Sequence, residues 1–309
     1  MFCRSPYGKA GQPHGAKGRT MIVWDSRQFA ISLTASVLIL ILLGLLISEA
    51  ALHRAYYVWP VFLAGVFYYL TMRRYIKRRR VVGTPFPEVW RSLLASHVAY
   101  YMALTPDERT SFERDVQIFL SEQTITGVGV EVTDLTRLLV AASAVMLTFG
   151  WREWEYDNVP EILIYPTSFS EDFEVTCPVA QRKLSGMVAP QGAVIFSSPD
   201  LCHSFSQEDS YHVGLHEFAH LLDMEAWQTD GIPKNLSASL RKRWLTVFRN
   251  EMERARRGES LLREYAGENL PECFAVAVEC FFKVPDRLRE YDPILYGLLA
   301  SYFNQDIVE

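Results

Sequence analysis

The feature that most constrains this chain is an uncharged, strongly apolar run of 19 residues from Phe29 to Ile47. A helix needs about 20 apolar residues to cross the hydrocarbon core of a bilayer, so this run predicts a transmembrane helix. A second apolar run, from Tyr56 to Met72, is shorter and rich in tyrosine, a residue type that concentrates at membrane interfaces. We therefore expect a two-helix transmembrane hairpin over residues 29–72, with helices at 29–47 and 56–72.

Basic residues flank the hairpin at its two outer ends. Six of the eight residues from Arg73 to Arg80 are basic, and the N-terminal segment 1–28 holds five more, whereas the connector 48–55 has a single arginine. Short loops rich in lysine and arginine stay on the cytoplasmic side of a membrane. The expected location is therefore the inner (cytoplasmic) membrane, with both ends of the hairpin and the rest of the chain in the cytoplasm.

The sequence of this N-terminal region allows two other interpretations. Ser48-Glu49-Ala50 loosely fits a signal-peptide cleavage site, but a lead of 28 residues and an apolar run of 19 are both long for a signal peptide. Met21 is an alternative start of the chain, which would remove part of the basic segment. Neither interpretation moves the remainder of the chain out of the cytoplasm.

Charge is divided unevenly between the two parts of the chain. Residues 1–83 carry 12 Lys or Arg and 2 Asp or Glu, whereas residues 84–309 carry 19 and 34. Nucleic-acid binding needs a basic surface that displaces phosphate counterions. The acidic C-terminal part therefore indicates a protein without a nucleic-acid partner.

The C-terminal part is predicted to be α+β, mostly helical around a small sheet. Apolar spacing at helical period, capping residues and proline positions locate the helices, and short runs of β-branched residues locate the strands. The expected helices are 88–104, one that opens at Pro106, 135–147, 210–224, 236–256, 271–282 and 293–303. The expected strands are 124–132, 161–166 and 192–197. Residues 194–198 are expected to form an edge strand to which an extended peptide can add.

The chemistry-bearing motif is His216-Glu217-Phe218-Ala219-His220, an H-E-x-x-H sequence in the predicted helix 210–224. Histidines four residues apart lie on one face of a helix, so both imidazoles can bind one metal ion. Zinc suits two imidazoles, a carboxylate and a water. Glu217 lies about 100° around the helix and can act as general base on a zinc-activated water. The motif predicts one Zn²⁺ per chain.

The third metal ligand is expected from residues 265–279. Glu272, in the first turn of the helix 271–282, is one candidate, although it would also suit the helix dipole there. Glu279, two turns later on the same face, is the other. Asp223 lies about 10 Å along the helix from His216, so it is expected to orient a ligand histidine or to cap the helix end. Tyr265 can donate its hydroxyl to a developing oxyanion, or pack as an aromatic residue.

Short segments spread along residues 84–306 carry a family resemblance. They are Thr84-Pro85-Phe86-Pro87, Leu163-Ile164-Tyr165-Pro166, the sequence from Leu215 to Met224, Tyr265-Ala266, the sequence from Pro271 to Val276, Glu279 with Phe281-Phe282, and Gln305-Asp306. Together they resemble the Mlc titration factor A family of zinc peptidases, which is itself related to the peptidase domain of anthrax lethal factor. The resemblance implies a zincin-like metallopeptidase domain with zinc held by His216, His220 and Glu272. It also implies Glu217 as the base and Tyr265 as the catalytic tyrosine, and it favours Glu272 over Glu279.

These observations give a domain plan and two functional hypotheses. The plan is a basic segment (1–28), the transmembrane hairpin (29–72), a polybasic juxtamembrane linker (73–87) and a zinc metallopeptidase domain (88–309). The leading hypothesis is a membrane-anchored, cytoplasm-facing zinc metallopeptidase that hydrolyses a peptide or protein substrate, with an aminopeptidase preference implied by the resemblance. The alternative is a regulatory binding protein that sequesters a transcription factor, with zinc mainly structural. Glu217 favours the enzyme, because a binding module needs no base between its ligands.

Overall fold

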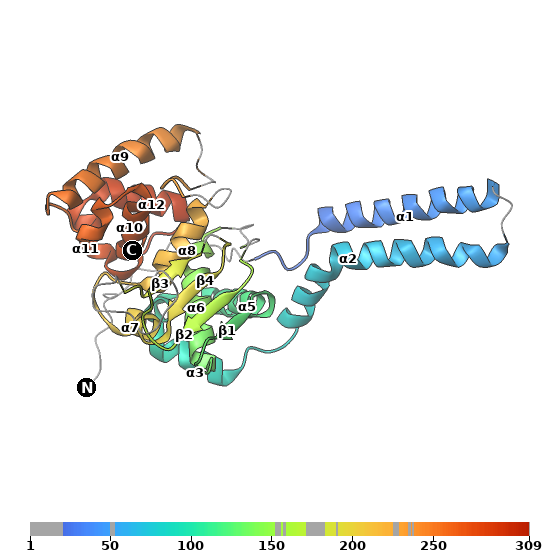
Figure 1. Cartoon of the computed structure of the whole chain (residues 1–309), viewed down its shortest axis with the longest axis horizontal. Helices are drawn as coiled ribbons and strands as arrows, with labels where there is room; N and C mark the ends of the chain where they lie inside the picture. The colour runs from blue at the N-terminus through green and yellow to red at the C-terminus, as the bar shows by residue number, and fades with distance from the viewer. Residues whose placement is uncertain are drawn as a thin grey trace. The chain divides into compact units, whose positions relative to one another are not determined.

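The computed structural model describes most of the chain as two compact units. The described residues are 21–49, 53–151, 156, 159–170, 183–189, 191–224, 229–233, 236 and 238–308. One unit comprises residues 22–85, and the other extends from residue 86 to the C-terminal end and includes Met21. Figure 1 labels most of the helices and all four strands. The first 20 residues of the predicted segment 1–28, and Ala50 of the cleavage site considered above, lie outside the described residues.

The N-terminal unit is a pair of helices packed against each other (Figure 1). Helix α1 spans Ser26–Glu49 and helix α2 spans Val58–Val82, joined in part by the short 3-10 helix η1, Arg54–Tyr57. Among the described helices, α1 alone is both long and apolar enough to cross a membrane, with a mean hydropathy of 2.8. Helix α2 joins the second apolar run to the basic residues without a break, and its transmembrane placement stays a prediction.

The C-terminal unit is mostly helical around a small mixed sheet, as predicted. The strands are β1 (Ile125–Gly127), β2 (Ile162–Tyr165), β3 (Gly186–Val188) and β4 (Val194–Ser197). Their order is β1-β2-β4-β3, with β3 antiparallel to β4 and the other pairs parallel. The prediction that residues 194–198 form an edge strand was wrong, because β4 pairs on both sides and β3 is the edge. All four side chains of β4 are buried, which is typical of an internal strand.

The C-terminal unit also contains helices. They are α3 (Glu88–His97), α4 (Ala99–Ala103), α5 (Pro106–Glu122), α6 (Asp134–Thr148), α7 (Ser198–Ser206), α8 (Val213–Asp223), α9 (Ala238–Arg256), α10 (Leu270–Lys283), α11 (Pro285–Tyr291) and α12 (Pro293–Phe303), with the 3-10 helix η2 at Glu264–Gly267. Of these helices, α7 and α8 contact the sheet. The predicted helix 88–104 is interrupted at Val98, whose backbone is extended. Helices α7 and α11 were not predicted.

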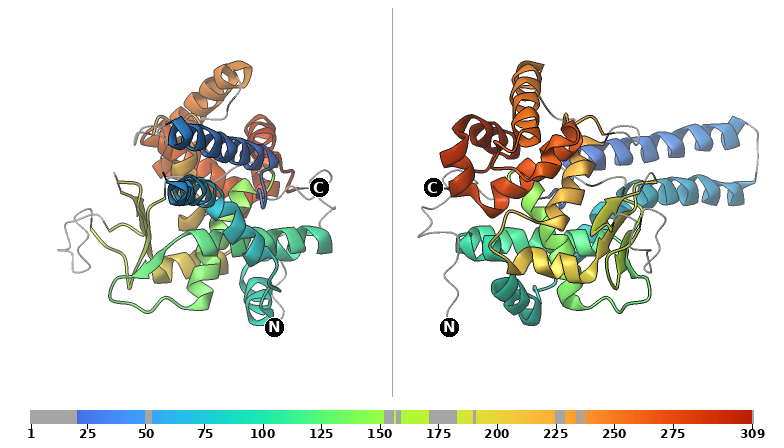
Figure 2. Two further views of the ribbon diagram at one scale, coloured as in Figure 1. Left: turned by 90° about the vertical axis from the view of Figure 1, so that its right-hand side faces the viewer. Right: turned by 60° about the vertical axis from the view of Figure 1, so that its left-hand side comes forward.

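Helix α8 is held in the centre of this unit, where it packs against α6, α10, β3 and β4 (Figure 2). Helix α6 is apolar on nearly all sides and almost completely buried, as expected for a core helix. Gly214 allows α8 to approach α6 closely, since a Cβ atom at this position would lie 2.1 Å from Ser143 Oγ. The packing of α8 therefore depends on a residue without a side chain.

We expect opposite effects from alanine at two helical glycines. Gly214→Ala introduces a clash with Ser143 in α6 and should lower the free energy of unfolding by about 1–3 kcal/mol. Gly297→Ala lies in α12, where a Cβ atom meets nothing within 4 Å, and should raise it by up to about 1 kcal/mol. Urea unfolding followed by tryptophan fluorescence measures both, and equal effects from the two substitutions would contradict the close packing of α8 on α6.

Candidate metal centre

Helix α8 presents two imidazoles one turn apart. The Nε2 atoms of His216 and His220 lie 3.2 Å from each other, and both side chains are largely buried. The helix is capped at its N-terminus by His212, whose Nδ1 accepts a hydrogen bond from the backbone N–H of Leu215. His212 is thus a buried residue that caps helix α8.

Glu272 joins the two histidines from the first turn of α10. That turn is fixed by Asn269, whose side-chain oxygen accepts from the Glu272 N–H at 2.9 Å. Glu272 Oε2 lies 3.0 Å from His216 Nε2 and 3.6 Å from His220 Nε2. One ligand atom from each of the three residues lies within 4.8 Å of the other two, so a single metal ion can contact all three.

The unsatisfied polar atoms of this cluster fit a metal site. Glu272 Oε2 is buried and lacks hydrogen-bond geometry with any partner, and so does His220 Nδ1. Burial by itself would lower the pKa of His216, but Glu272 and Glu279 outweigh it and raise that pKa to about 10. A metal ion therefore competes with a proton for this imidazole. Two imidazoles and one carboxylate are the ligand set of many catalytic zinc sites.

Glu279 lies behind His216 instead of among the ligand atoms. Its Oε1 is 2.9 Å from His216 Nδ1, and its Oε2 accepts from the backbone N–H of His212. The side chain is completely buried and also pairs with Arg263. An imidazole that donates Nδ1–H to a carboxylate keeps the lone pair of Nε2 for a metal. The structure thus places Glu279 where it can orient His216, and not at the nitrogen that faces Glu272.

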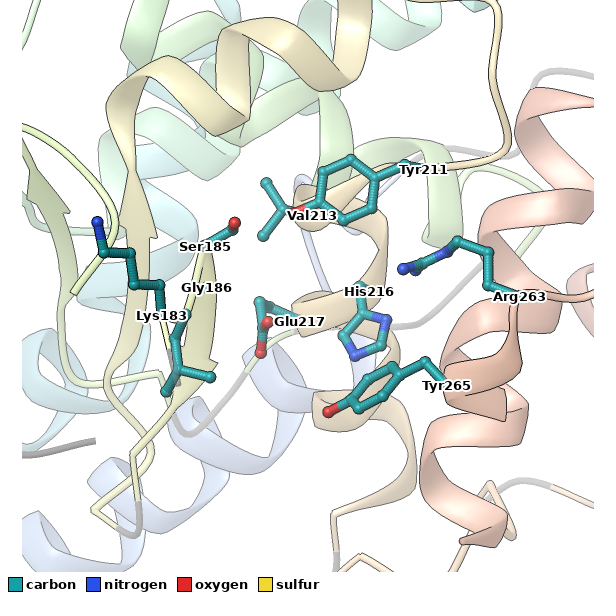
Figure 3. Close-up of a pocket in the computed structure, with 10 residues that line it drawn as sticks. Lys183, Ser185, Gly186, Tyr211, Val213, His216, Glu217, Arg263 and Tyr265 are labelled. Atoms are coloured by element: carbon teal, nitrogen blue, oxygen red, sulfur yellow. The ribbon is translucent and has the colours of Figure 1, made fainter. Parts of the chain in front are cut away.

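Glu217 borders a pocket of about 320 Å³ beside the histidines. The residues that line this pocket are Lys183, Leu184, Ser185, Gly186, Tyr211, Val213, His216, Glu217, Arg263 and Tyr265. Figure 3 shows Glu217 and His216 facing the same space. Burial raises the pKa of Glu217 above its usual value, which brings a carboxyl group closer to the range useful for a general base. Gly186 in β3 lies so close that a Cβ atom there would be 2.7 Å from Glu217 Oε1.

Tyr265 reaches the pocket from η2. Its ring stacks against the His216 imidazole, with centroids 5.8 Å apart and planes inclined by 29°. Figure 3 shows its hydroxyl on the side of His216 that Glu217 occupies. This placement is compatible with both roles predicted for Tyr265, packing as an aromatic residue and hydrogen-bond donation to a developing oxyanion.

Asp223 does not contact either histidine of the cluster through a hydrogen bond among those that the structure describes. Its carboxylate accepts from the backbone N–H groups of Asp230, Gly231 and Ile232, at 3.3, 2.7 and 2.8 Å. Burial raises the pKa of this carboxyl to about 6. The expectation that Asp223 orients a ligand histidine was wrong, because its side chain leaves the end of α8 toward the following loop. It fixes residues 230–232 instead.

Sequence reasoning missed Arg263 and Tyr211, which lie side by side at the pocket (Figure 3). The Arg263 guanidinium sits 4.9 Å above the Tyr211 ring and pairs with Glu279. The signal available in the sequence was Glu279 itself. A glutamate within an apolar helix needs a buried partner, and Arg263 lies close to the motif residue Tyr265 in the chain.

Comparison with known proteins agrees with this geometry. The sequence profile of the family described as glucose-regulated metallo-peptidase M90 matches residues 72–304. An uncharacterised protein of Synechocystis sp. is 27% identical over 241 residues, which cover 74% of this chain and 87% of that protein. Mlc titration factor A of Edwardsiella ictaluri is 33% identical over 188 residues, covering 55% of this chain and 67% of the relative. Mlc titration factor A of Salmonella arizonae is 27% identical over 238 residues, covering 71% and 91%.

The family match spans the whole metal cluster, from α8 to the N-terminal turn of α10. The resemblance seen in the sequence is therefore confirmed over most of the chain. The chain is a member of the glucose-regulated metallopeptidase family M90.

Proposed function

We propose that this protein is a membrane-anchored, cytoplasm-facing zinc metallopeptidase that hydrolyses peptide bonds. His216, His220 and Glu272 hold the zinc ion, and Glu217 is the general base. The observation that carries the proposal is the convergence of three ligand atoms within 4.8 Å, beside a pocket that Glu217 lines. Two imidazoles and a carboxylate favour zinc among the common divalent metals.

The chain's own groups divide the work of peptide hydrolysis. A bound zinc ion supplies Lewis acidity, which polarises the substrate carbonyl and lowers the pKa of water. Glu217 accepts the proton of the attacking water and passes it to the leaving nitrogen. Tyr265 donates a hydrogen bond from its hydroxyl to the carbonyl oxygen as that oxygen gains negative charge. Glu279 holds His216 in the tautomer that offers Nε2 to the metal.

Strand β3 is the support for an extended substrate in this proposal. It is an edge strand of the sheet, and its first residue, Gly186, borders the pocket next to Glu217. Leu184, just before the strand, already pairs with Phe169. A peptide can hydrogen bond to such an edge and present its backbone carbonyl to the site. The aminopeptidase preference implied by the family resemblance belongs to this proposal, and it is tested by comparing peptides with free and acetylated N-termini.

The membrane anchor rests on α1 and on its charged flanks. Most large apolar side chains of α1 are exposed, for example Leu42 at 59% and Leu46 at 64%. Exposed apolar surface of this extent on a long helix suits lipid and not water. We extend the proposal to α2, whose apolar part pairs with α1 and whose basic end stays on the cytoplasmic side.

A second candidate function is binding to a transcriptional regulator. The name shared by several relatives, Mlc titration factor A, describes proteins that titrate Mlc. In this alternative the body of the protein sequesters a repressor, and zinc is mainly structural. The substitution of Glu217 separates the two functions, because repressor binding needs no general base.

Replacing Glu217 by glutamine should abolish hydrolysis and keep the metal. The amide cannot accept a proton from water, so the loss in kcat should be about 10²–10⁴-fold. Hydrolysis of a fluorogenic peptide library by the zinc-loaded full chain measures this. Glu264→Gln is the matched control, since Glu264 is exposed beside Tyr265 in η2 and should leave the rate unchanged. Activity that survives Glu217→Gln, or no hydrolysis by the parent protein, would contradict a peptidase.

Removing a ligand should release the metal. We expect one zinc ion per chain by mass spectrometry of the purified protein, and much less than one in Glu272→Gln. The glutamine keeps the hydrogen-bonded turn at Asn269 but replaces a charged ligand by a neutral one. Thermal unfolding checks the same point, because zinc should raise the midpoint of the parent protein and not that of the variant. Full zinc occupancy in Glu272→Gln would remove this residue from the ligand set.

The topology should also be measurable. The full chain is expected to resist extraction from membranes by alkaline carbonate, since an inserted apolar helix is not released by breaking charge contacts. Protease added to inverted inner-membrane vesicles should digest residues 88–309, and protease outside intact spheroplasts should leave them whole. Protection in the inverted vesicles would reverse the orientation, and full extraction by carbonate would exclude the anchor.

A further inference from the structure

Helix α9 carries a basic surface on an otherwise acidic domain. Residues 238–257 hold seven of the 19 basic residues found between positions 84 and 309, but only two of the 34 acidic ones. Figure 2 shows α9 at the periphery of the C-terminal unit. The surface of this peripheral helix is therefore positively charged, whereas the rest of the domain is acidic.

The helix is strongly two-sided. Trp244, Phe248 and Ala255 lie on its inner side and are almost completely buried in the core. At 100° per residue the opposite side holds a different set. The exposed basic residues of this outer side are Lys242, Arg243, Arg249 and Arg256, and the exposed Arg257 directly follows the helix. We call these five residues the α9 basic face.

Part of this charge is not neutralised within the domain. Arg256 pairs with Glu253 at 2.6 Å, and Arg257 pairs with Glu259 at 3.2 Å. For Lys242, Arg243 and Arg249, no acidic group lies within ion-pair distance in the part of the chain that the structure describes. These three residues lie within two turns of helix, so they form a compact cationic surface that is open to an anionic partner.

We propose that the α9 basic face binds the anionic headgroups of the membrane that anchors the chain. The anchoring proposed above keeps the domain close to a bilayer, so that even a weak site meets lipid at a high effective concentration. The basic residues from Arg73 to Arg80 offer the same chemistry to the same surface. Thr246 and Asn250 lie among the cations of this face, and without apolar side chains the contact is electrostatic and does not insert into the bilayer.

An acidic surface fits these observations better than a nucleic acid does. The remainder of residues 84–309 is strongly acidic and repels a polyanion that extends past one helix. A flat bilayer surface can contact the α9 basic face alone, without approaching the acidic remainder of the domain. The inference goes beyond the proposed peptidase activity, since it uses neither the metal nor Glu217, and its consequence is a fixed orientation of the domain on the membrane.

The test uses the full chain in lipid nanodiscs and Lys242 as a built-in probe. Discs contain either phosphatidylcholine alone or phosphatidylcholine with phosphatidylglycerol, and co-elution of protein and disc is established first. Exposed lysines are acetylated with a water-soluble reagent and quantified by mass spectrometry. Lys183, which is exposed at the pocket, is the internal reference. The charge-reversal variant is R243E/R249E, and R287E/R289E on α11 is the control with the same change in net charge.

Modification of Lys242 is expected to slow by about threefold or more in the discs with phosphatidylglycerol, and Lys183 to be unaffected. About 0.5 M salt should remove the protection, because it screens charge over a few ångströms. R243E/R249E should lose the protection and R287E/R289E keep it. Equal rates in the two kinds of disc, protection that survives salt or R243E/R249E, or protection by heparin but not by lipid would each overturn the inference. Failure to co-elute with discs would instead contradict the proposed anchor.

Discussion

Two carboxylates of helix α10 contact the two ring nitrogens of His216, and the rest of the site depends on these contacts. Glu272 and Glu279 lie two turns apart on α10. One faces His216 Nε2 at 3.0 Å and the other lies 2.9 Å from His216 Nδ1. The pair connects α10 to α8, and Glu279 at Nδ1 leaves the Nε2 lone pair of His216 for a metal. The same two carboxylates therefore link the contact between α8 and α10 to the orientation of His216.

Such a group of charges is costly inside a protein unless each member has a partner. Glu279 is completely buried, and the contacts that compensate it come from His216, His212 and Arg263. Arg263 is in turn held over the Tyr211 ring at the pocket. Gly186 borders the pocket, and its lack of a side chain leaves room for Glu217. The site is therefore shaped by the buried partners of Glu279 and by the space that Gly186 leaves for Glu217.

Much of this arrangement could be predicted from local sequence, and the failures have physical causes. The helices carrying His216 and Glu272 follow from apolar spacing and caps, which act within a few residues. Strand β3 has three residues and depends on pairing with β4, so no local pattern marks it. Asp223 was misassigned because its partners at 230–232 follow the helix end, and Arg263 was missed because its pairing with Glu279 is a tertiary contact. Ligand choice between Glu272 and Glu279 needed the family resemblance. In the structure Glu272 faces Nε2 of both histidines, whereas Glu279 faces His216 Nδ1.

The central claim is that one zinc ion is held by His216, His220 and Glu272. Anomalous diffraction from crystals of the zinc-loaded full chain, recorded on both sides of the zinc absorption edge, tests it most directly. We expect one strong peak at about 2.0–2.2 Å from His216 Nε2, His220 Nε2 and a Glu272 carboxylate oxygen, with Glu279 outside the coordination shell. A peak bound to Glu279 in place of Glu272, or one located elsewhere on the chain, would contradict it.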